Sequence, residues 1–277
     1  MSPSPVVPWS ALVVEDEPRL RAGLVALTVP CIVEYILTAL FARKYIKALP
    51  ENDPDPPSAW TQFAFTMPLS FGGFLLATVP FMIAAFVGHS ADHETMLAVH
   101  YVTIGIVNPV SYAAVRMQAV AIAFPPEYKG DRRVFLFAVG AGLLLCVLPL
   151  LLLLPSVGLW YFHGVQNVPV ADVWMARAAM AFYAVVPILQ TVRGHAEGLA
   201  AWMRRPNAIL AGQAMNLAAL VITLFVTLSF GMAGWKMSVT AYLVATASTI
   251  LTVWLGIMLA RFEERFGTPP RSVLRER

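Results

Sequence analysis

Residues 134–154 read VFLFAVGAGLLLCVLPLLLLL, a run of 21 residues without a single charged side chain. A helix rises about 1.5 Å per residue, so roughly 20 apolar residues cross the ~30 Å hydrocarbon core of a bilayer. Comparable stretches occur along the whole chain. They lie at 22–45, 60–88, 95–123, 134–162, 172–203, 207–230 and 235–262. The sequence therefore predicts an all-α integral membrane protein with about seven transmembrane helices.

The composition also favours a membrane protein over a soluble one. Hydrophobic residues make up 58% of the chain and charged residues 13%, whereas soluble domains contain roughly 25% charged residues. The net charge of +3 does not indicate nucleic-acid binding, because the cations lie at the ends of the apolar stretches and form no basic face. Cys31 and Cys146 lie inside apolar stretches and are expected to be buried thiols rather than a disulfide.

The distribution of charge and proline divides the chain into five parts. We expect a loose leader at 1–21, a first transmembrane helix at 22–45, a proline-rich linker at 46–59, a six-helix bundle at 60–262 and a basic tail at 263–277. The leader carries acidic residues where a secretory signal would be basic. The linker, which contains the sequence ENDPDPP, is the best internal boundary.

The lysines and arginines predict the orientation of the helices. If every stretch spans the membrane, 13 of the 19 cations lie on the side that holds the linker and the tail. Cytoplasmic loops are enriched in Lys and Arg, so this side is expected to be cytoplasmic, in an inner or plasma membrane. Arg19 and Arg21 precede the first helix on its expected outer side, so the side of the N-terminus stays open.

Three arginines lie inside the apolar stretches, and the most informative is Arg193. Gln190, Arg193 and Glu197 are spaced three and four residues apart, which places them on one face of a helix. His195 lies about 200° around the helix from Arg193. A charge at this depth costs at least about 2.5–3.5 kcal/mol and needs a partner or a polar cavity.

Two interpretations of this face are open. In the first, Arg193 and Glu197 form an ion pair that pins neighbouring helices. In the second, Arg193 binds an anionic substrate and Glu197 orients or releases it. A planar guanidinium suits the second role because it donates two hydrogen bonds at once to phosphate or carboxylate. Small residues such as Gly194 and Gly198, on one face of the same helix, are expected to let neighbouring helices approach closely.

The third stretch carries Asn108, Arg116 and Gln118. Arg116 has no acidic residue within one turn of its own helix, so its partner would be Glu34, Glu197, water or a ligand. Alternatively its side chain extends to the inner headgroups. Arg177, the third arginine, is expected to be an interfacial anchor. The candidate substrate-binding residues are Arg193, Arg116, Gln190, Glu197, His195 and Asn108.

No motif indicates an enzyme or a cofactor. The chain contains no nucleophile elbow, P-loop, metalloprotease helix or dinucleotide-binding loop. His89, Asp92, His93 and Glu94 lie close together in a turn, but their spacing matches no familiar metal site and we expect a solvated turn. The expected partners are the lipid bilayer and a small anionic solute, and no nucleic acid.

The run TVRGHAEG at 191–198, followed by a basic turn and another long apolar stretch, resembles the progressive ankylosis (ANK) family of transporters. That family has a V-R-small-H-x-x-G run at the matching place. Residues that fit this run are Val192, Arg193, Gly194, His195 and Gly198. Trp60, Pro68 and Arg116 fit the family's layout more loosely. The resemblance covers about 60–265 and is sharpest at 187–206.

The resemblance implies a fold similar to the multidrug and toxic compound extrusion (MATE) flippases, which have two six-helix bundles and work by alternating access. The stretch 22–45 would then be the last helix of the first bundle, and 60–262 would be the whole second bundle. The chain thus looks like a C-terminal half, with five helices of the fold missing. The resemblance therefore implies a further partner, namely a second half-transporter chain or a second copy. Glu197 departs from the family, whose animal members have an uncharged residue there, and this departure points to proton coupling.

The ANK family is associated with the export of pyrophosphate, nucleoside triphosphates and citrate. These are multivalent anions, which suits an arginine inside the membrane. We therefore expect a transporter that exports a multivalent anion by alternating access. Two alternatives remain, namely a proton- or sodium-coupled exporter of drugs or lipid precursors, and a non-transporting membrane scaffold.

Overall fold

The computed structural model shows two compact units, Met1–Pro57 and Ser58–Arg277. The described residues are 25, 28–29, 32–33, 35–43, 58–124 and 131–266. In the first unit, residues 35–43 are helical and belong to the stretch predicted as the first transmembrane helix. The leader, the linker up to residue 57, Glu34 and the tail beyond residue 266 lie outside the described residues.

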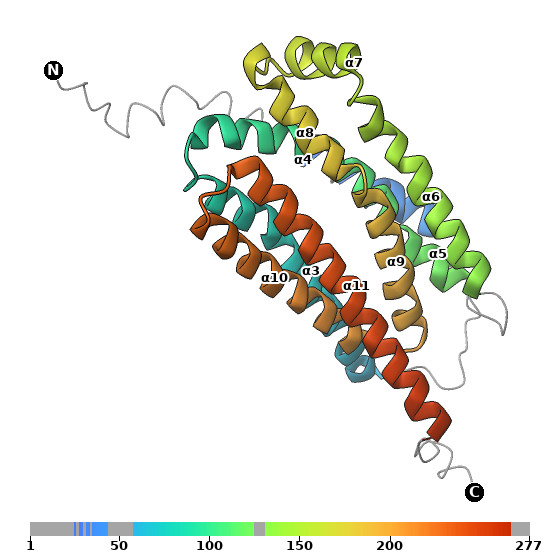
Figure 1. Ribbon diagram of the computed structural model, residues 1–277. Helices are drawn as coiled ribbons and strands as arrows, with labels where there is room; N and C mark the ends of the chain where they lie inside the picture. The colour runs from blue at the N-terminus through green and yellow to red at the C-terminus, as the bar shows by residue number, and fades with distance from the viewer. Residues whose placement is uncertain are drawn as a thin grey trace, which may run out of the picture. The chain divides into compact units, whose positions relative to one another are not determined.

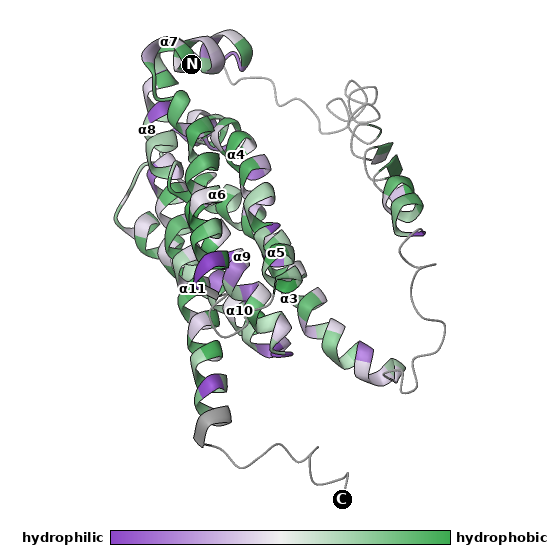
Figure 2. Cartoon of the chain, turned by 90° about the vertical axis from the view of Figure 1, so that its right-hand side faces the viewer, coloured by the Kyte–Doolittle hydropathy of each residue, from purple (hydrophilic) through white to green (hydrophobic). Residues whose placement is uncertain are grey.

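Six helical segments of the second unit are long and apolar enough to cross a membrane. They are Ala59–Val87, His93–Ala123, Arg132–Leu151, Val170–Trp202, Pro206–Ser229 and Gly234–Phe262. Hydrophobic residues run along nearly the whole length of these helices (Figure 2), and the described residues contain no strand. Large apolar side chains such as Phe81, Leu144 and Leu251 are exposed, as lipid-facing side chains would be. The chain is thus an all-helical, multi-pass membrane protein.

Prolines account for two features that the hydrophobic pattern did not predict. The stretch 134–162 is not one helix, because α6 (Asp131–Leu151) ends early and Pro155 begins a separate short helix, α7 (Pro155–Leu159). Proline suits the first turn of a helix, where its missing N–H is not needed. The stretch 172–203 is divided into α8 (Val173–Tyr183) and α9 (Val186–Trp202) just before Pro187, whose ring disfavours a continuous helix.

Contacts between the remaining helices divide the bundle into two groups (Figure 1). The first group contains α3 (Ala59–Val87), α10 (Pro206–Ser229) and α11 (Gly234–Phe266), which pack against one another. The second group contains α6, α8, α9, α4 (His93–Val115) and α5 (Met117–Ala123). The two groups meet mainly where α11 contacts α9, α4 and α8.

Helix α9 is the most enclosed helix of the bundle. Of its 17 residues, 12 are buried, and it contacts α4, α5, α6, α10 and α11. In an 18-residue apolar window of Val170–Trp202, 56% of the residues are buried, against 22% in the corresponding windows of α3 and α6. Any polar side chain on α9 therefore lies among other helices rather than against lipid.

Glycines allow α9 to lie this close to its neighbours. A Cβ atom on Gly198 would lie 2.6 Å from Ala121 Cβ and 2.7 Å from the Gln118 carbonyl oxygen in α5. A Cβ atom on Gly194 would lie 3.0 Å from the Val115 carbonyl oxygen. The prediction that these two glycines form one packing face is confirmed. At Gly73 and Gly140, by contrast, an added Cβ would meet nothing within 4 Å.

We expect Gly198→Ala to destabilise the bundle and Gly140→Ala to leave it unchanged or slightly more stable. The first substitution pushes a methyl group into backbone and Cβ atoms of α5, and such overpacking costs about 1–3 kcal/mol. The second adds a methyl group in open space and favours the helix. Thermal unfolding of the two purified variants in detergent checks this, and equal unfolding temperatures would contradict it.

Candidate functional site

A buried ion pair lies in the centre of the bundle. Arg193 Nε donates a hydrogen bond to Glu197 Oε1 at 2.8 Å, and the two residues are 5% and 3% exposed. Among the described residues, no other Lys, Arg, Asp or Glu is buried. Both residues lie on α9 one turn apart, so the pair neutralises its own charge but does not pin one helix to another. The ion pair of the first interpretation is thus confirmed.

The ion pair uses only part of the hydrogen-bonding capacity of Arg193. A guanidinium has five N–H donors, and within the described part of the chain the Nε group is the one that binds Glu197. The two Nη groups therefore remain for other acceptors. Because both charges are removed from water, each is expensive to leave alone, and losing one partner costs several kcal/mol.

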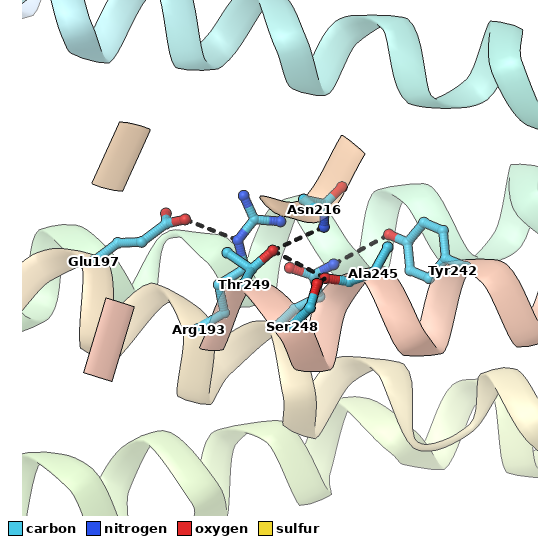
Figure 3. A network of polar contacts seen from close by, with 8 residues as sticks. Arg193, Glu197, Asn216, Tyr242, Ala245, Ser248 and Thr249 are labelled. Carbon is cyan, nitrogen blue, oxygen red and sulfur yellow. Dashed lines mark hydrogen bonds and ion pairs between the residues drawn. The ribbon is translucent and has the colours of Figure 1, made fainter. Parts of the chain in front are cut away.

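Gln190 extends the polar face of α9 toward the first helix group. Its side chain is 3% exposed, and its Nε2 group donates to the hydroxyl of Tyr242 in α11 at 3.1 Å (Figure 3). Its Oε1 atom is buried and has no hydrogen-bond partner within the described residues. Gln190, Arg193 and Glu197 are all buried on α9.

Helices α10 and α11 contribute further polar side chains to this region. Asn216 Nδ2 donates to Thr249 Oγ1 at 2.9 Å, and Thr249 Oγ1 donates to the Ala245 carbonyl oxygen at 3.0 Å. Asn216 and Thr249 are buried, and Figure 3 draws them in the same part of the bundle as the ion pair. The central polar cluster is defined here as Gln190, Arg193, Glu197, Asn216, Tyr242 and Thr249.

A second polar contact, which the sequence analysis did not single out, joins the two helix groups nearer the start of α11. The hydroxyl of Ser238 in α11 lies 2.7 Å from His100 Nδ1 in α4 and 2.7 Å from the hydroxyl of Tyr183 in α8. All three residues are buried. The Tyr183 ring also meets the Tyr242 ring edge-to-face at 5.9 Å. A buried histidine inside an apolar stretch was the signal that could have revealed this contact.

The other candidate residues lie outside the central polar cluster. His195 is fully buried beside the rings of Phe135 in α6 and Trp254 in α11, at centroid distances of 5.5 and 6.1 Å. Arg116 is exposed at the break between α4 and α5, and Asn108 is half-buried in α4. The structure thus brings together three of the six candidates, all of them on α9.

Arg177 and the acidic turn have simpler roles. Arg177, in α8, donates from Nη2 to the carbonyl oxygen of Leu153, in the turn that follows α6. It therefore ties α8 to this turn, near one end of the bundle. His89, Asp92, His93 and Glu94 are exposed. The described residues contain no group of three or more His, Cys, Asp or Glu side chains that could hold a metal ion.

The fold and the site define a multi-pass helical membrane protein with a buried charge pair where its two helix groups meet. Comparison of the chain with known protein families, with curated proteins and with solved structures finds no match.

We expect Arg193→Gln to lower the free energy of unfolding by about 3–5 kcal/mol, because it leaves the Glu197 carboxylate buried without a counter-ion. The double variant R193Q/E197Q should lose far less, because two neutral side chains replace the two charges together. Denaturant unfolding in detergent at mildly alkaline pH, followed by circular dichroism, measures both. Equal losses in the single and double variants would mean that the two charges do not compensate each other.

We expect Ser238→Ala to destabilise the bundle by about 1–3 kcal/mol, because it deprives buried His100 and Tyr183 of their shared hydrogen-bond partner. Ser229→Ala is the matched control, because the exposed Ser229 hydroxyl bonds only to the Phe225 carbonyl oxygen of its own helix. The same unfolding measurement applies. A Ser238→Ala protein as stable as the control would show that this contact does not hold the two helix groups together.

Proposed function

We propose that this chain forms a helix bundle of a membrane transporter that exports a multivalent anion, such as pyrophosphate, a nucleotide or citrate, by alternating access. The observation that carries the proposal is the buried Arg193–Glu197 pair on the helix at the centre of the bundle. Charged residues inside transmembrane segments are rare and commonly mark the path of a solute or an ion.

The chemistry of Arg193 favours an anion as the solute. Its Nη groups are not engaged by Glu197 and can form the planar, two-pronged contact that phosphate and carboxylate groups accept. The Oε1 atom of Gln190, which has no partner within the described residues, and the amide of Asn216 add neutral polar groups to the same region. We assign the anion to Arg193 rather than to Arg116, because Arg116 is exposed.

A purely structural role explains the pair less well. Replacing a buried ion pair with apolar residues is often neutral or stabilising by about 1–4 kcal/mol. Stability alone therefore does not explain why an ion pair occupies this position. The pair also lies within one helix and does not join α9 to a neighbour. Within the described part of the chain, the hydrogen bonds that link the two helix groups include those of Gln190 with Tyr242 and of Ser238 with His100 and Tyr183. Such an interface suits groups that rock against each other.

The family resemblance and the arrangement of cations fit the same proposal. Arg132, Arg133, Arg204, Arg205 and Arg261 belong to helix ends that consecutive spans bring to the same end of the bundle (Figure 1). The enrichment of cations on cytoplasmic loops supports a cytoplasmic position for this end and for the C-terminus. The resemblance to the ANK family implies a second six-helix bundle, which another chain or a second copy would supply.

A proton-coupled exporter of drugs or lipid precursors is the second candidate. Glu197 favours it, because a buried carboxylate can bind and release a proton during transport. Competition experiments separate the two candidates. An apolar cation that drives proton movement through the protein, with no effect of added pyrophosphate or citrate, would favour this second function.

We expect purified protein in liposomes to move labelled pyrophosphate, citrate or ATP, and R193Q/E197Q to lose this flux while still inserting. The double variant is preferred to Arg193→Ala because it leaves no unpaired buried charge. Lys236→Gln is the control, because Lys236 is an exposed cation that lies over the Trp235 ring, away from the central polar cluster. Flux in the double variant equal to that of the unaltered protein would refute Arg193 as the anion site.

A further inference from the structure

The partner of Arg193 in the structure is Glu197, so an anion that binds Arg193 must compete with a carboxylate already in place. We propose that Glu197 takes up one proton when the anion binds, so that a proton and the anion occupy the site together. This inference rests on the proposed function. It adds the coupled ion and the residue that carries it.

The reason is the balance of charge in a buried site. In the structure the arginine and the carboxylate sum to zero at a hydrogen-bonded distance of 2.8 Å. An anionic group that joined the pair would leave one uncompensated negative charge among apolar helices, which is strongly unfavourable. When Glu197 becomes a neutral carboxylic acid, the anionic group replaces it as the partner of Arg193. The proton thus compensates one negative charge of the bound anion.

The geometry makes this exchange local. Glu197 lies one turn from Arg193 on the same helix, so the pair can open by rotation of side chains without separating two helices. The Arg193 Nε group gives up one acceptor, and the guanidinium turns its donors to the incoming oxyanion. Release reverses the order, because loss of the proton restores the carboxylate, which then displaces the anion from Arg193.

Among the side chains that the structure describes on the neighbouring helices, no other Asp or Glu is buried and could take this proton instead. Helix α10 has none within its span. In α11 the half-buried Tyr242 accepts a hydrogen bond from Gln190. In α4 the buried His100 is bound to Ser238. The remaining ionisable groups of the helices that contact α9 include Arg116, Arg132 and Arg133, which are exposed, and Cys146, a buried thiol. Glu197 is the buried carboxylate that directly contacts Arg193.

Because proton uptake accompanies anion binding, the apparent affinity for the anion should depend on pH. Where Glu197 is ionised in the empty protein, uptake of one proton with the anion should tighten apparent binding up to about tenfold for each unit by which the pH falls. Glu197→Gln mimics the protonated acid, so it should bind the anion well at every pH and lose this dependence. Glu197→Asp keeps an acid one methylene shorter and should keep the dependence.

The experiment is calorimetric titration of the purified full-length protein with pyrophosphate, citrate and ATP in turn, across a range of pH. Each titration is repeated in two buffers of different ionisation enthalpy, which reports the protons taken up on binding. Acid titration of each anion without protein corrects for protonation of the anions themselves, and R193Q/E197Q corrects for binding away from Arg193. The unaltered protein provides the proton count, so the test stands even if Glu197→Gln fails to fold.

We expect uptake of close to one proton for each anionic group that binds Arg193, and pH-independent binding by Glu197→Gln. Binding that depends on Arg193 but takes up no proton and has the same corrected affinity at every pH would overturn the inference and leave the proposed function standing. If Glu197→Gln weakened anion binding by the same factor at every pH, the pH dependence would not come from Glu197. Glu197 would then be a structural residue, and the inference would also be overturned. No binding of any of the three anions would count against both.

Discussion

The ion pair between Arg193 and Glu197 is the interaction on which the rest of the bundle depends. Helix α9 carries two charges and an amide, yet it is the most enclosed of the six spans. A helix with one unpaired charge could not occupy that position, because the cost of burying the charge would be several kcal/mol. Placing the opposite charge one turn away makes α9 neutral overall. The pair therefore allows a polar helix to lie in the centre of an apolar protein.

Close packing on a neighbouring face of α9 determines where these polar groups lie. Gly194 and Gly198 bring the α4–α5 segment within contact of the α9 backbone, and Gly142 does the same for α6 through Ile188 and Thr191. Helices thus lie close to α9 on those sides. The face with Gln190 and Arg193 is left toward α11, where Gln190 binds Tyr242. Small residues and polar residues thus act together, since the first set the position of the helix and the second fill its remaining side.

The contact between the two helix groups combines apolar packing with a few hydrogen bonds. Tyr183 is shared by both kinds of interaction, because its hydroxyl binds Ser238 and its ring packs on Tyr242. Hydrogen bonds of this type are worth about 0.6–2 kcal/mol in membranes, so they stabilise the interface only modestly. A charge pair that can exchange its partner, placed beside such an interface, is an arrangement through which binding of a solute can favour one packing of the groups over another.

The sequence by itself determined the class of protein and the face of α9 that carries the charges. Length of apolar run and helical spacing are local properties, so the six spans within 60–262 and the alignment of Gln190, Arg193 and Glu197 could be read directly. Only the tertiary structure decided that Arg193 is paired within its own helix, that Arg116 is exposed, and that His100, Tyr183 and Ser238 meet. Those facts depend on how helices distant in the chain rotate and pack, and on how prolines divide a continuous apolar stretch. Neither is encoded in the periodicity of a single helix.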